Sequence, residues 1–268
     1  MAENYQTGVN VEYYKPLLND FLKENKEIFM KSGYPWGLFI PYTLPNYSQA
    51  PIKIFYVGLD TYYWVEKKIM LESYEKNRIE EYFEANQSAV TMDTTLNWGN
   101  AAGAFWSFVD KLHLYIRTGE LKDLTNLEDK DKEIIKEVGY GNINCMELNN
   151  TLFNKEQEIS PNDCDLDKLY IIREKSRSFD KLSHILEAYK PDIIVILTWA
   201  DREDIFGDLD YTWHEELYKD KIHAVYSLKD YNTKVLWSSH PRRFSFIGEN
   251  QESMVHELGD LVLKLSNK

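Results

Sequence analysis

One apolar run limits the folds open to this chain more than any other feature. Its sequence, Asp192-Ile-Ile-Val-Ile-Leu-Thr198, is continuous and rich in β-branched side chains. A strand of this kind has no polar face, so both of its faces must be covered, as in a parallel sheet that lies between helices. The run therefore predicts an α/β protein with a buried, mainly parallel sheet.

Other strands and helices are expected along the rest of the chain. Apolar segments bounded by turn residues predict strands at 52–58, 139–148, 222–227 and 233–239. Apolar residues at helical spacing predict helices at 12–31, 104–112, 173–189 and 249–265. Strands separated by helices and long connections favour parallel pairing.

The chain of 268 residues is expected to form a single domain, 1–268. Its 43% hydrophobic and 28% charged residues are typical of a globular protein with a large core. Charged helical segments near 66–96 and 119–138 are interpreted as insertions in that domain.

Polar or aromatic residues follow several of the expected strands. Asp60 follows the strand at 52–58, Asn149 and its neighbour Asn150 follow the strand at 139–148, Trp199 follows the run at 192–198, and His240 follows the strand at 233–239. Parallel sheets bind ligands at the carboxyl ends of their strands, so these residues are expected on one rim. The alternative for Asp60 is a solvated turn after a core strand, and for the two asparagines it is closure of a turn.

Two further features concern the kind of ligand. Trp98 and its neighbour Asn97 precede a helix, where N-terminal amides could meet an anion or simply be capped. The net charge of −13 disfavours tight, non-specific DNA binding, although a local basic pair such as Arg242 and Arg243 can act over about one Debye length, roughly 8 Å.

Composition also bears on cofactors and location. Cys145 and Cys164 are the only cysteines, without paired spacing or a nearby histidine cluster, so no metal site and no cofactor are expected. No apolar run approaches the roughly 18 residues of a membrane span, and no signal peptide is recognisable. A cytoplasmic protein with reduced thiols is expected.

Four segments, in order, resemble motifs of the uracil-DNA glycosylase superfamily. Val57-Gly-Leu-Asp-Thr-Tyr62 resembles Gly-Gln-Asp-Pro-Tyr, and Leu148-Asn149 resembles the Leu-Leu-Asn strand end. Leu197-Thr-Trp-Ala200 is similar to Leu-Trp-Gly, and His240-Pro-Arg-Arg-Phe244 to His-Pro-Ser-Pro-Leu. Phe105-Trp106 is similar to the Phe-Trp of the mismatch-glycosylase branch. The resemblance implies a three-layer α/β/α sandwich with a central, mainly parallel four-stranded sheet. It also implies that this chain is a divergent, outlying member of the superfamily.

The resemblance also implies roles for individual residues. Asp60 matches the family's aspartate, which orients or activates a water molecule. His240 matches the family's histidine, which stabilises charge on the departing base. Asn149, with Asn150 as its neighbour, takes the position that reads the base edge. Tyr62 falls at the gate against bulkier bases, and Trp98 is a further candidate for base recognition.

Contacts with DNA are implied for the loop after the last strand. Phe244 matches the position of the wedge that enters the duplex, and Arg242 and Arg243 replace the Ser-Pro pair of the motif. A base buried in a duplex must be extruded before it can react, which a wedge and a stacking pocket favour. The expected partner is DNA, either single-stranded or carrying a modified base.

Three functions remain open from the sequence. The first is hydrolysis of the N-glycosidic bond of a deaminated or modified base in DNA, a repair activity. The second is a non-catalytic protein of the same fold that binds nucleic acid, a nucleotide or a protein partner, as the altered motif residues Leu59 and Thr61 and the acidic charge suggest. The third is hydrolysis of free nucleosides or nucleotides, which does not require holding a polymer.

Overall fold

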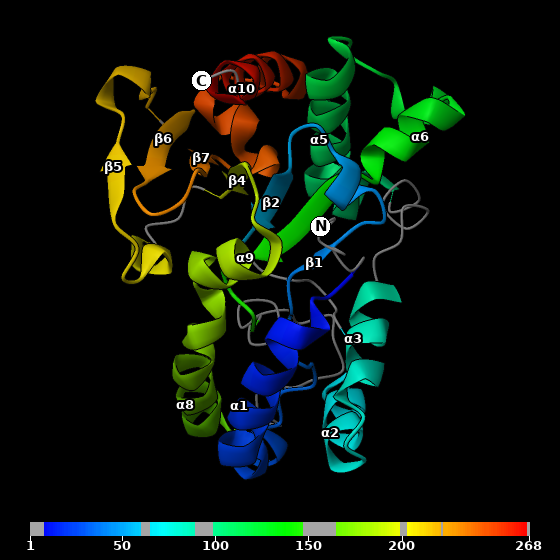
Figure 1. Ribbon diagram of the computed structural model, residues 1–268, viewed down its shortest axis with the longest axis vertical. Coiled ribbons are helices and arrows are strands. Elements are labelled where there is room, and N and C mark those ends of the chain that lie inside the picture. The colour runs from blue at the N-terminus through cyan, green and yellow to red at the C-terminus, as the bar shows by residue number, and fades with distance from the viewer. Residues whose placement is uncertain are drawn as a thin grey trace.

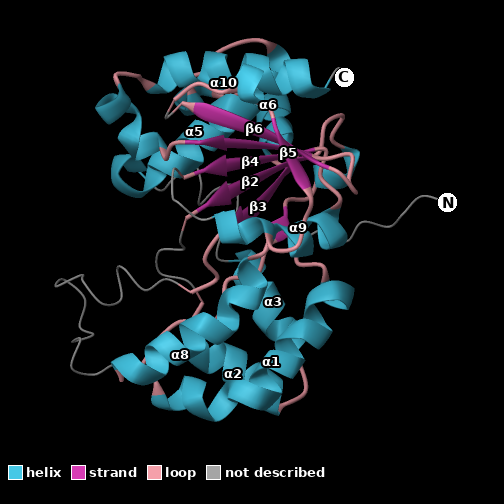
Figure 2. Ribbon diagram, turned by 90° about the vertical axis from the view of Figure 1, so that its left-hand side faces the viewer, coloured by secondary structure: helices cyan, strands magenta, loops and turns pink. Residues whose placement is uncertain are grey.

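The computed structural model describes residues 8–59, 65–88, 99–146, 165–198, 203–220 and 222–266. Within these ranges a central sheet is surrounded by helices (Figures 1 and 2). The strands, in order across the sheet, are β1 (Tyr42–Thr43), β3 (Val138–Asn142), β2 (Ile54–Gly58), β4 (Ile193–Leu197), β7 (Lys234–Ser238), β6 (His223–Leu228) and β5 (Tyr211–Trp213). The expected α/β class, with a mostly parallel sheet at the centre, is confirmed.

The sheet of the described residues has seven strands, so the expected count of four was wrong. β3, β2, β4 and β7 form a parallel block at its centre. The other strands are antiparallel and lie outside this block, β1 next to β3 on one side, and β6 and then β5 next to β7 on the other. β1 and β5 have only two and three residues, too few to show an alternating pattern in the sequence.

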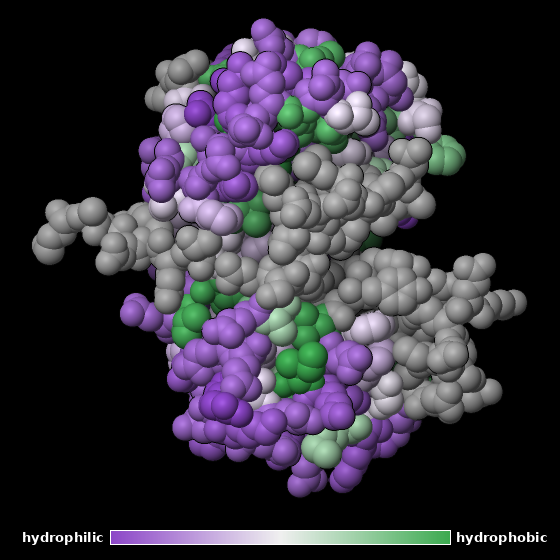
Figure 3. All heavy atoms as spheres, turned by 90° about the vertical axis from the view of Figure 1, so that its right-hand side faces the viewer, coloured by the Kyte–Doolittle hydropathy of each residue, from purple (hydrophilic) through white to green (hydrophobic). Residues whose placement is uncertain are grey.

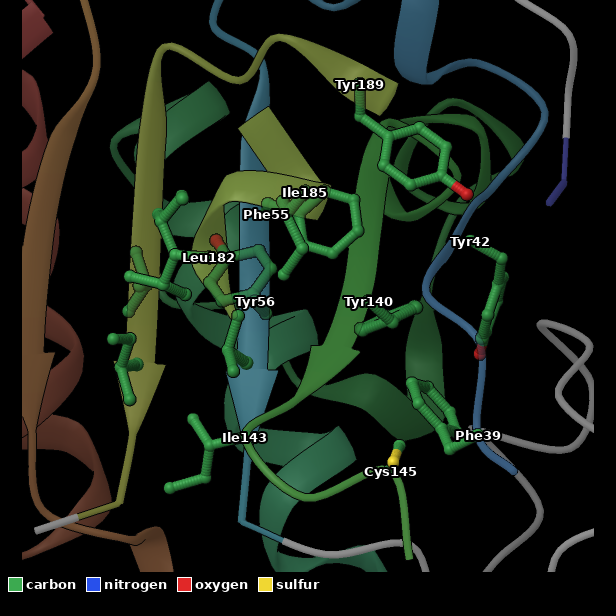
Figure 4. Packing of buried hydrophobic residues seen from close by; sticks show 14 of the residues in the cluster. Phe39, Tyr42, Phe55, Tyr56, Tyr140, Ile143, Cys145, Leu182, Ile185 and Tyr189 are labelled. Atoms are coloured by element: carbon green, nitrogen blue, oxygen red, sulfur yellow. The ribbon is translucent and has the colours of Figure 1, made fainter. Parts of the chain in front are cut away.

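Neighbouring residues of a strand point to opposite faces of the sheet, so the buried strands present apolar side chains on both faces. Helices cover both of these faces. On one face the ring of Tyr56 in β2 meets His113 of α5 (Gly99–Thr118), and α5 packs against α10 (Gln251–Ser266). On the other face Phe55 stacks on Tyr189 of α9 (Leu182–Tyr189), with ring centroids 5.2 Å apart (Figure 4). Every residue of β4 is buried, as its composition predicts.

β3 contains two glycines, which the neighbouring strand requires. A Cβ atom at Gly139 would lie 2.2 Å from the Phe55 ring, and one at Gly141 would lie 3.1 Å from the same ring. The large side chain on β2 therefore lies over the small residues of β3, and the sheet keeps a dense core without a side chain at either glycine.

A second group of helices lies farther from the sheet than α9 (Figure 2). It contains α1 (Val11–Lys31), α2 (Lys67–Glu75), α3 (Ile79–Ser88) and α8 (Leu166–Ser176), of which α1 packs against the other three. Lys26 of α1 pairs with Glu75 of α2 at 2.8 Å. Where described residues form the surface on the side of α3 and α6 (Asp129–Ile135), hydrophilic residues predominate (Figure 3).

Three of the predicted helices agree with the structure, and the one predicted at 173–189 does not. The segments 12–31 and 249–265 correspond to α1 and α10, and 104–112 lies within α5. The segment 173–189 is not a single helix, because α8 ends at Ser176 and a short 3-10 helix, Arg177–Asp180, precedes α9. Lys181 has an extended backbone with ψ near 138°, which interrupts the helical hydrogen bonds. The charged segments near 66–96 and 119–138 contain α2 and α3 in one case and α6 in the other.

Candidate functional site

The connections of the parallel block define where a ligand is expected. The chain passes from β2 to β3 on one side of it, and then crosses to β4 on the other side before reaching β7. In open α/β sheets such a reversal of direction leaves a crevice at the carboxyl ends of the strands. β2 lies at the reversal, so the crevice is expected beside Gly58, the last residue of β2.

Asn142 and Phe105 lie against Gly58. Gly58 and Asn142 are paired in register at the ends of β2 and β3. A Cβ atom at Gly58 would be 2.8 Å from the Asn142 Oδ1 atom and 3.4 Å from the Phe105 ring. The backbone after β3 stays beside the end of β2, because the backbone N–H of Asn144 donates a hydrogen bond to the Leu59 carbonyl at 3.0 Å. An amide side chain and an aromatic ring therefore meet at the end of β2.

His240 is connected to this group through Phe105. The two rings stack with centroids 6.2 Å apart and planes at 25°. His240 follows β7 and caps the 3-10 helix η7 (Pro241–Ile247), where its Nδ1 atom accepts a hydrogen bond from the Arg242 backbone amide at 3.2 Å. Because Nδ1 accepts, the proton of the neutral ring lies on Nε2.

His240 is neutral at physiological pH. Burial lowers the pKa of its imidazole to about 4, and the positive charges of Arg242 and Arg243 act in the same direction. A neutral imidazole with its proton on Nε2 can donate a hydrogen bond from that atom without first losing a proton.

The loop after His240 corrects one expectation. Phe244 is 1% exposed and its ring packs edge-on against Phe108 of α5, with centroids 4.9 Å apart. A wedge that enters a DNA duplex must be at the surface, so the expected contact of Phe244 with DNA is wrong for this structure. Phe246, two residues later, is 85% exposed, and Arg242 and Arg243 are exposed on the same short helix.

Five of the predicted site residues lie outside the described residues. They are the expected catalytic Asp60 and the expected recognition residues Tyr62, Trp98, Asn149 and Asn150. The structure describes His240, Arg242, Arg243 and Phe244 of that set. It brings His240 close to Phe105, which the sequence singled out only for its resemblance to a Phe-Trp pair.

Sequence reasoning missed Asn142 and Phe246. The strand expected at 139–148 ends at Asn142 in the structure. The available signal was that Asn142 is the first amide side chain in this segment. For Phe246, the signal was a second phenylalanine at a spacing of two from Phe244, which the short helix turns to a different side.

A buried polar cluster lies between α5 and the sheet, apart from this rim. Asp110 of α5 is 1% exposed, and neither of its carboxylate oxygens has a hydrogen-bond partner. Burial raises its pKa to about 8. Burial also raises the pKa values of Tyr56 and Tyr140, and the Asp110 carboxylate raises them further. The Tyr56 hydroxyl lies 3.3 Å from the His113 Nδ1 atom, and burial lowers the pKa of that histidine. Asp110 is therefore protonated in the folded protein at neutral pH.

The described part of the chain contains neither a candidate metal site nor a helix that could span a membrane. No group of three or more His, Cys, Asp or Glu side chains in that part could hold a metal ion. None of its helices has the length and apolar character that crossing a bilayer requires. Comparison with known proteins gives no protein-family model that matches the chain and no curated protein that matches its sequence.

Proposed function

We propose that this protein hydrolyses the N-glycosidic bond of a deaminated or modified base in nucleic acid, with His240 stabilising the departing base. The observation that carries the proposal is the state of His240, a half-buried neutral imidazole whose Nδ1 atom is occupied by the Arg242 amide. Its Nε2–H group is then the donor available to a substrate. We also propose that the fold is a three-layer sandwich, with α5 and α10 on one face of the sheet and α9 on the other.

The reaction explains why such a donor is useful. When the bond between the sugar C1′ and the base nitrogen breaks, its electron pair passes to the base and is delocalised onto a ring carbonyl oxygen. A hydrogen bond from Nε2–H to that oxygen stabilises the charge as it develops. Water adds to C1′ and gives up a proton, for which we propose the carboxylate of Asp60 as acceptor.

Recognition of the base is proposed for Asn142 and Phe105. The Asn142 amide offers both a donor and an acceptor, which suits the edge of a base. It lies at the end of β3 beside Gly58, where the absence of a side chain gives it room. The Phe105 ring offers an aromatic surface next to His240, on which a base can stack.

Binding of the polymer is proposed for the exposed side of η7. Arg242 and Arg243 can contact phosphates, and the Phe246 ring can stack on or between bases. The net charge of −13 opposes non-specific binding, so we expect affinity to depend strongly on the base and on salt. The same charge favours the second candidate, a non-catalytic protein that uses this rim for binding alone.

A base-release screen tests the proposal. Oligonucleotides that each carry one deaminated, alkylated or oxidised base, in single-stranded and duplex form, are incubated with the protein and cleaved with alkali at abasic sites. Free nucleosides are included to test the hydrolysis of monomers. For a base that is released, His240→Ala is expected to lower the rate roughly 100-fold or more, since it removes the donor to the departing base.

His256→Ala is the matched control, because His256 is exposed on α10 and meets the Tyr115 ring edge-on, with centroids 4.8 Å apart. Unchanged release by His240→Ala would remove His240 from the reaction. Failure to release any base, together with oligonucleotide binding that Arg242→Ala and Arg243→Ala weaken, would favour the non-catalytic candidate.

A further inference from the structure

The outer edge of β5 has backbone groups without partners in the sheet. Among the described strands, β5 is the last on its side and pairs only with β6. The Lys229 amide donates to the Asp210 carbonyl and the His214 amide to the Val225 carbonyl, each at 2.9 Å. Because hydrogen-bonded pairs alternate in an antiparallel ladder, the N–H and C=O groups of Tyr211 and Trp213 point away from β6. Figure 1 shows β5 at the outer side of the sheet.

Aromatic side chains accompany this edge. Tyr211, Trp213 and Tyr218 are 37%, 46% and 42% exposed. The Tyr211 ring packs on Phe206, with centroids 4.5 Å apart, and Trp213 meets Tyr218 edge-on at 5.7 Å. Tyr211 and Trp213 are two residues apart and lie on the same face of the sheet. The rings are thus partly fixed by packing and still accessible, as in surfaces that bind a peptide.

Carboxylates surround the same edge. Asp208 and Asp210 precede β5, and Glu215 and Glu216 follow it, and all four are exposed. Lys229 pairs with Asp210 at 3.4 Å, whereas Asp208 and Glu215 have no ion-pair partner in the described part of the chain. A second copy of this edge would bring the same carboxylates together, so the charge favours a partner of opposite sign.

We propose that the outer edge of β5 is a docking site for an extended, basic peptide segment of a partner protein. The segment adds a strand antiparallel or parallel to β5 and bonds to the backbone groups of Tyr211 and Trp213. Its Lys or Arg side chains lie over the exposed rings of Trp213 and Tyr218 and reach the carboxylates at the two ends of the strand. This proposal does not rest on the function proposed for the rim around His240.

A peptide of defined sequence tests the docking. The probe is an acetylated, amidated and labelled peptide that alternates Lys with Val, and binding is measured by fluorescence anisotropy. Trp213→Pro removes an N–H that points outward and leaves the ladder with β6 intact, a position that edge strands tolerate. Trp213→Val is the matched control, because it removes the same ring and retains the N–H. We expect Trp213→Pro to bind roughly tenfold more weakly than Trp213→Val.

Two further measurements test the charge of the partner and the self-association of the protein. A peptide with Glu in place of Lys is expected to bind at least roughly tenfold more weakly, and equal binding would refute the selection for basic partners. Equal affinity of Trp213→Pro and Trp213→Val, with both variants folded by circular dichroism, would refute strand addition. Concentration-dependent self-association that Trp213→Pro abolishes would instead assign the edge to a second copy of the chain.

Discussion

The ring of Phe105 on α5 stacks on the imidazole of His240, which follows β7, with centroids 6.2 Å apart. The same ring lies against Gly58 at the end of β2. One aromatic side chain therefore joins a helix and two parallel strands at the rim of the sheet. The position of His240 depends on contacts that come from three separate parts of the sequence.

A side chain at position 58 is expected to move Asn142. In Gly58→Ala the new Cβ would start 2.8 Å from the Asn142 Oδ1 atom, well inside van der Waals contact, and the amide must rotate away. The free energy of unfolding should change by no more than about 1 kcal/mol, because the displaced atom is at the end of a side chain. The side-chain amide signals of Asn142 in an NMR spectrum should shift. Those of Asn144, which accepts a hydrogen bond from Arg173, should not, and unmoved Asn142 signals would contradict the expectation.

Removing the neighbouring positive charges is expected to raise the pKa of His240. Burial is the main cause of its low pKa of about 4, and Arg242 and Arg243 lower it further because they disfavour the imidazolium. In Arg242→Ala and Arg243→Ala the pKa should rise but remain below the ordinary value of about 6.5, since the burial is retained. Titration of the ring protons by NMR measures this without any substrate. A pKa that is unchanged in both variants would show that the two charges are screened by solvent.

The two phenylalanines of η7 are expected to respond differently to truncation. Phe244→Ala removes a buried ring from its contact with Phe108 and should lower the free energy of unfolding by about 3–5 kcal/mol. Phe246→Ala removes an exposed ring and should leave stability within about 0.5 kcal/mol, while weakening the binding of oligonucleotides. Urea denaturation and fluorescence anisotropy measure the two effects. Equal losses of stability would contradict the assigned burial.

The protonated Asp110 predicts a stability that falls as pH rises. Its pKa is raised by burial to about 8, above the value of about 4 for an unfolded aspartate. Between these values the folded state holds a proton that the unfolded state has lost, so this group reduces the free energy of unfolding as pH increases. The slope is on the order of 1 kcal/mol per pH unit and ends near the folded pKa.

Asp110→Asn tests this relationship, because the amide has the same shape and does not ionise. The difference in stability between the variant and the original protein should grow from pH 5 to pH 8 in favour of the variant, as measured by urea denaturation. Taking the difference removes the contributions of other groups, including the nearby His113, whose lowered pKa has its own pH dependence. A difference that is constant with pH would show that Asp110 is already ionised in the folded protein.

The central strands could be predicted from sequence because their character is local. β4 is continuously apolar and β-branched, and a strand with no polar face must be buried. The outer strands β1 and β5 could not be predicted, because they are too short to show periodicity and exist through pairing with distant residues. The expected end of β3 lay beyond Asn142, because the apolar residues Ile143, Cys145 and Met146 continue after the strand and are buried without belonging to it.

The candidate site was predictable only in outline. The rule that ligands bind at the carboxyl ends of parallel strands placed His240 on the rim without reference to its contacts. The exposure of Phe246 and the burial of Phe244 depend on which side of η7 faces α5, and a segment of seven residues does not encode that direction. The roles expected of Asp60 and Asn149 remain predictions, because these residues lie outside the described part of the chain.

The fit between Phe55 and the glycines of β3 also bears on how this sequence can diverge. Because a Cβ atom at Gly139 would overlap the Phe55 ring, neither position can change alone without either a clash or a void. Divergent chains of this fold are expected to exchange the two together, with a small residue at position 55 when position 139 or 141 carries a larger one. Positions 55 and 139 are thus expected to vary together, although they are more than eighty residues apart in the sequence.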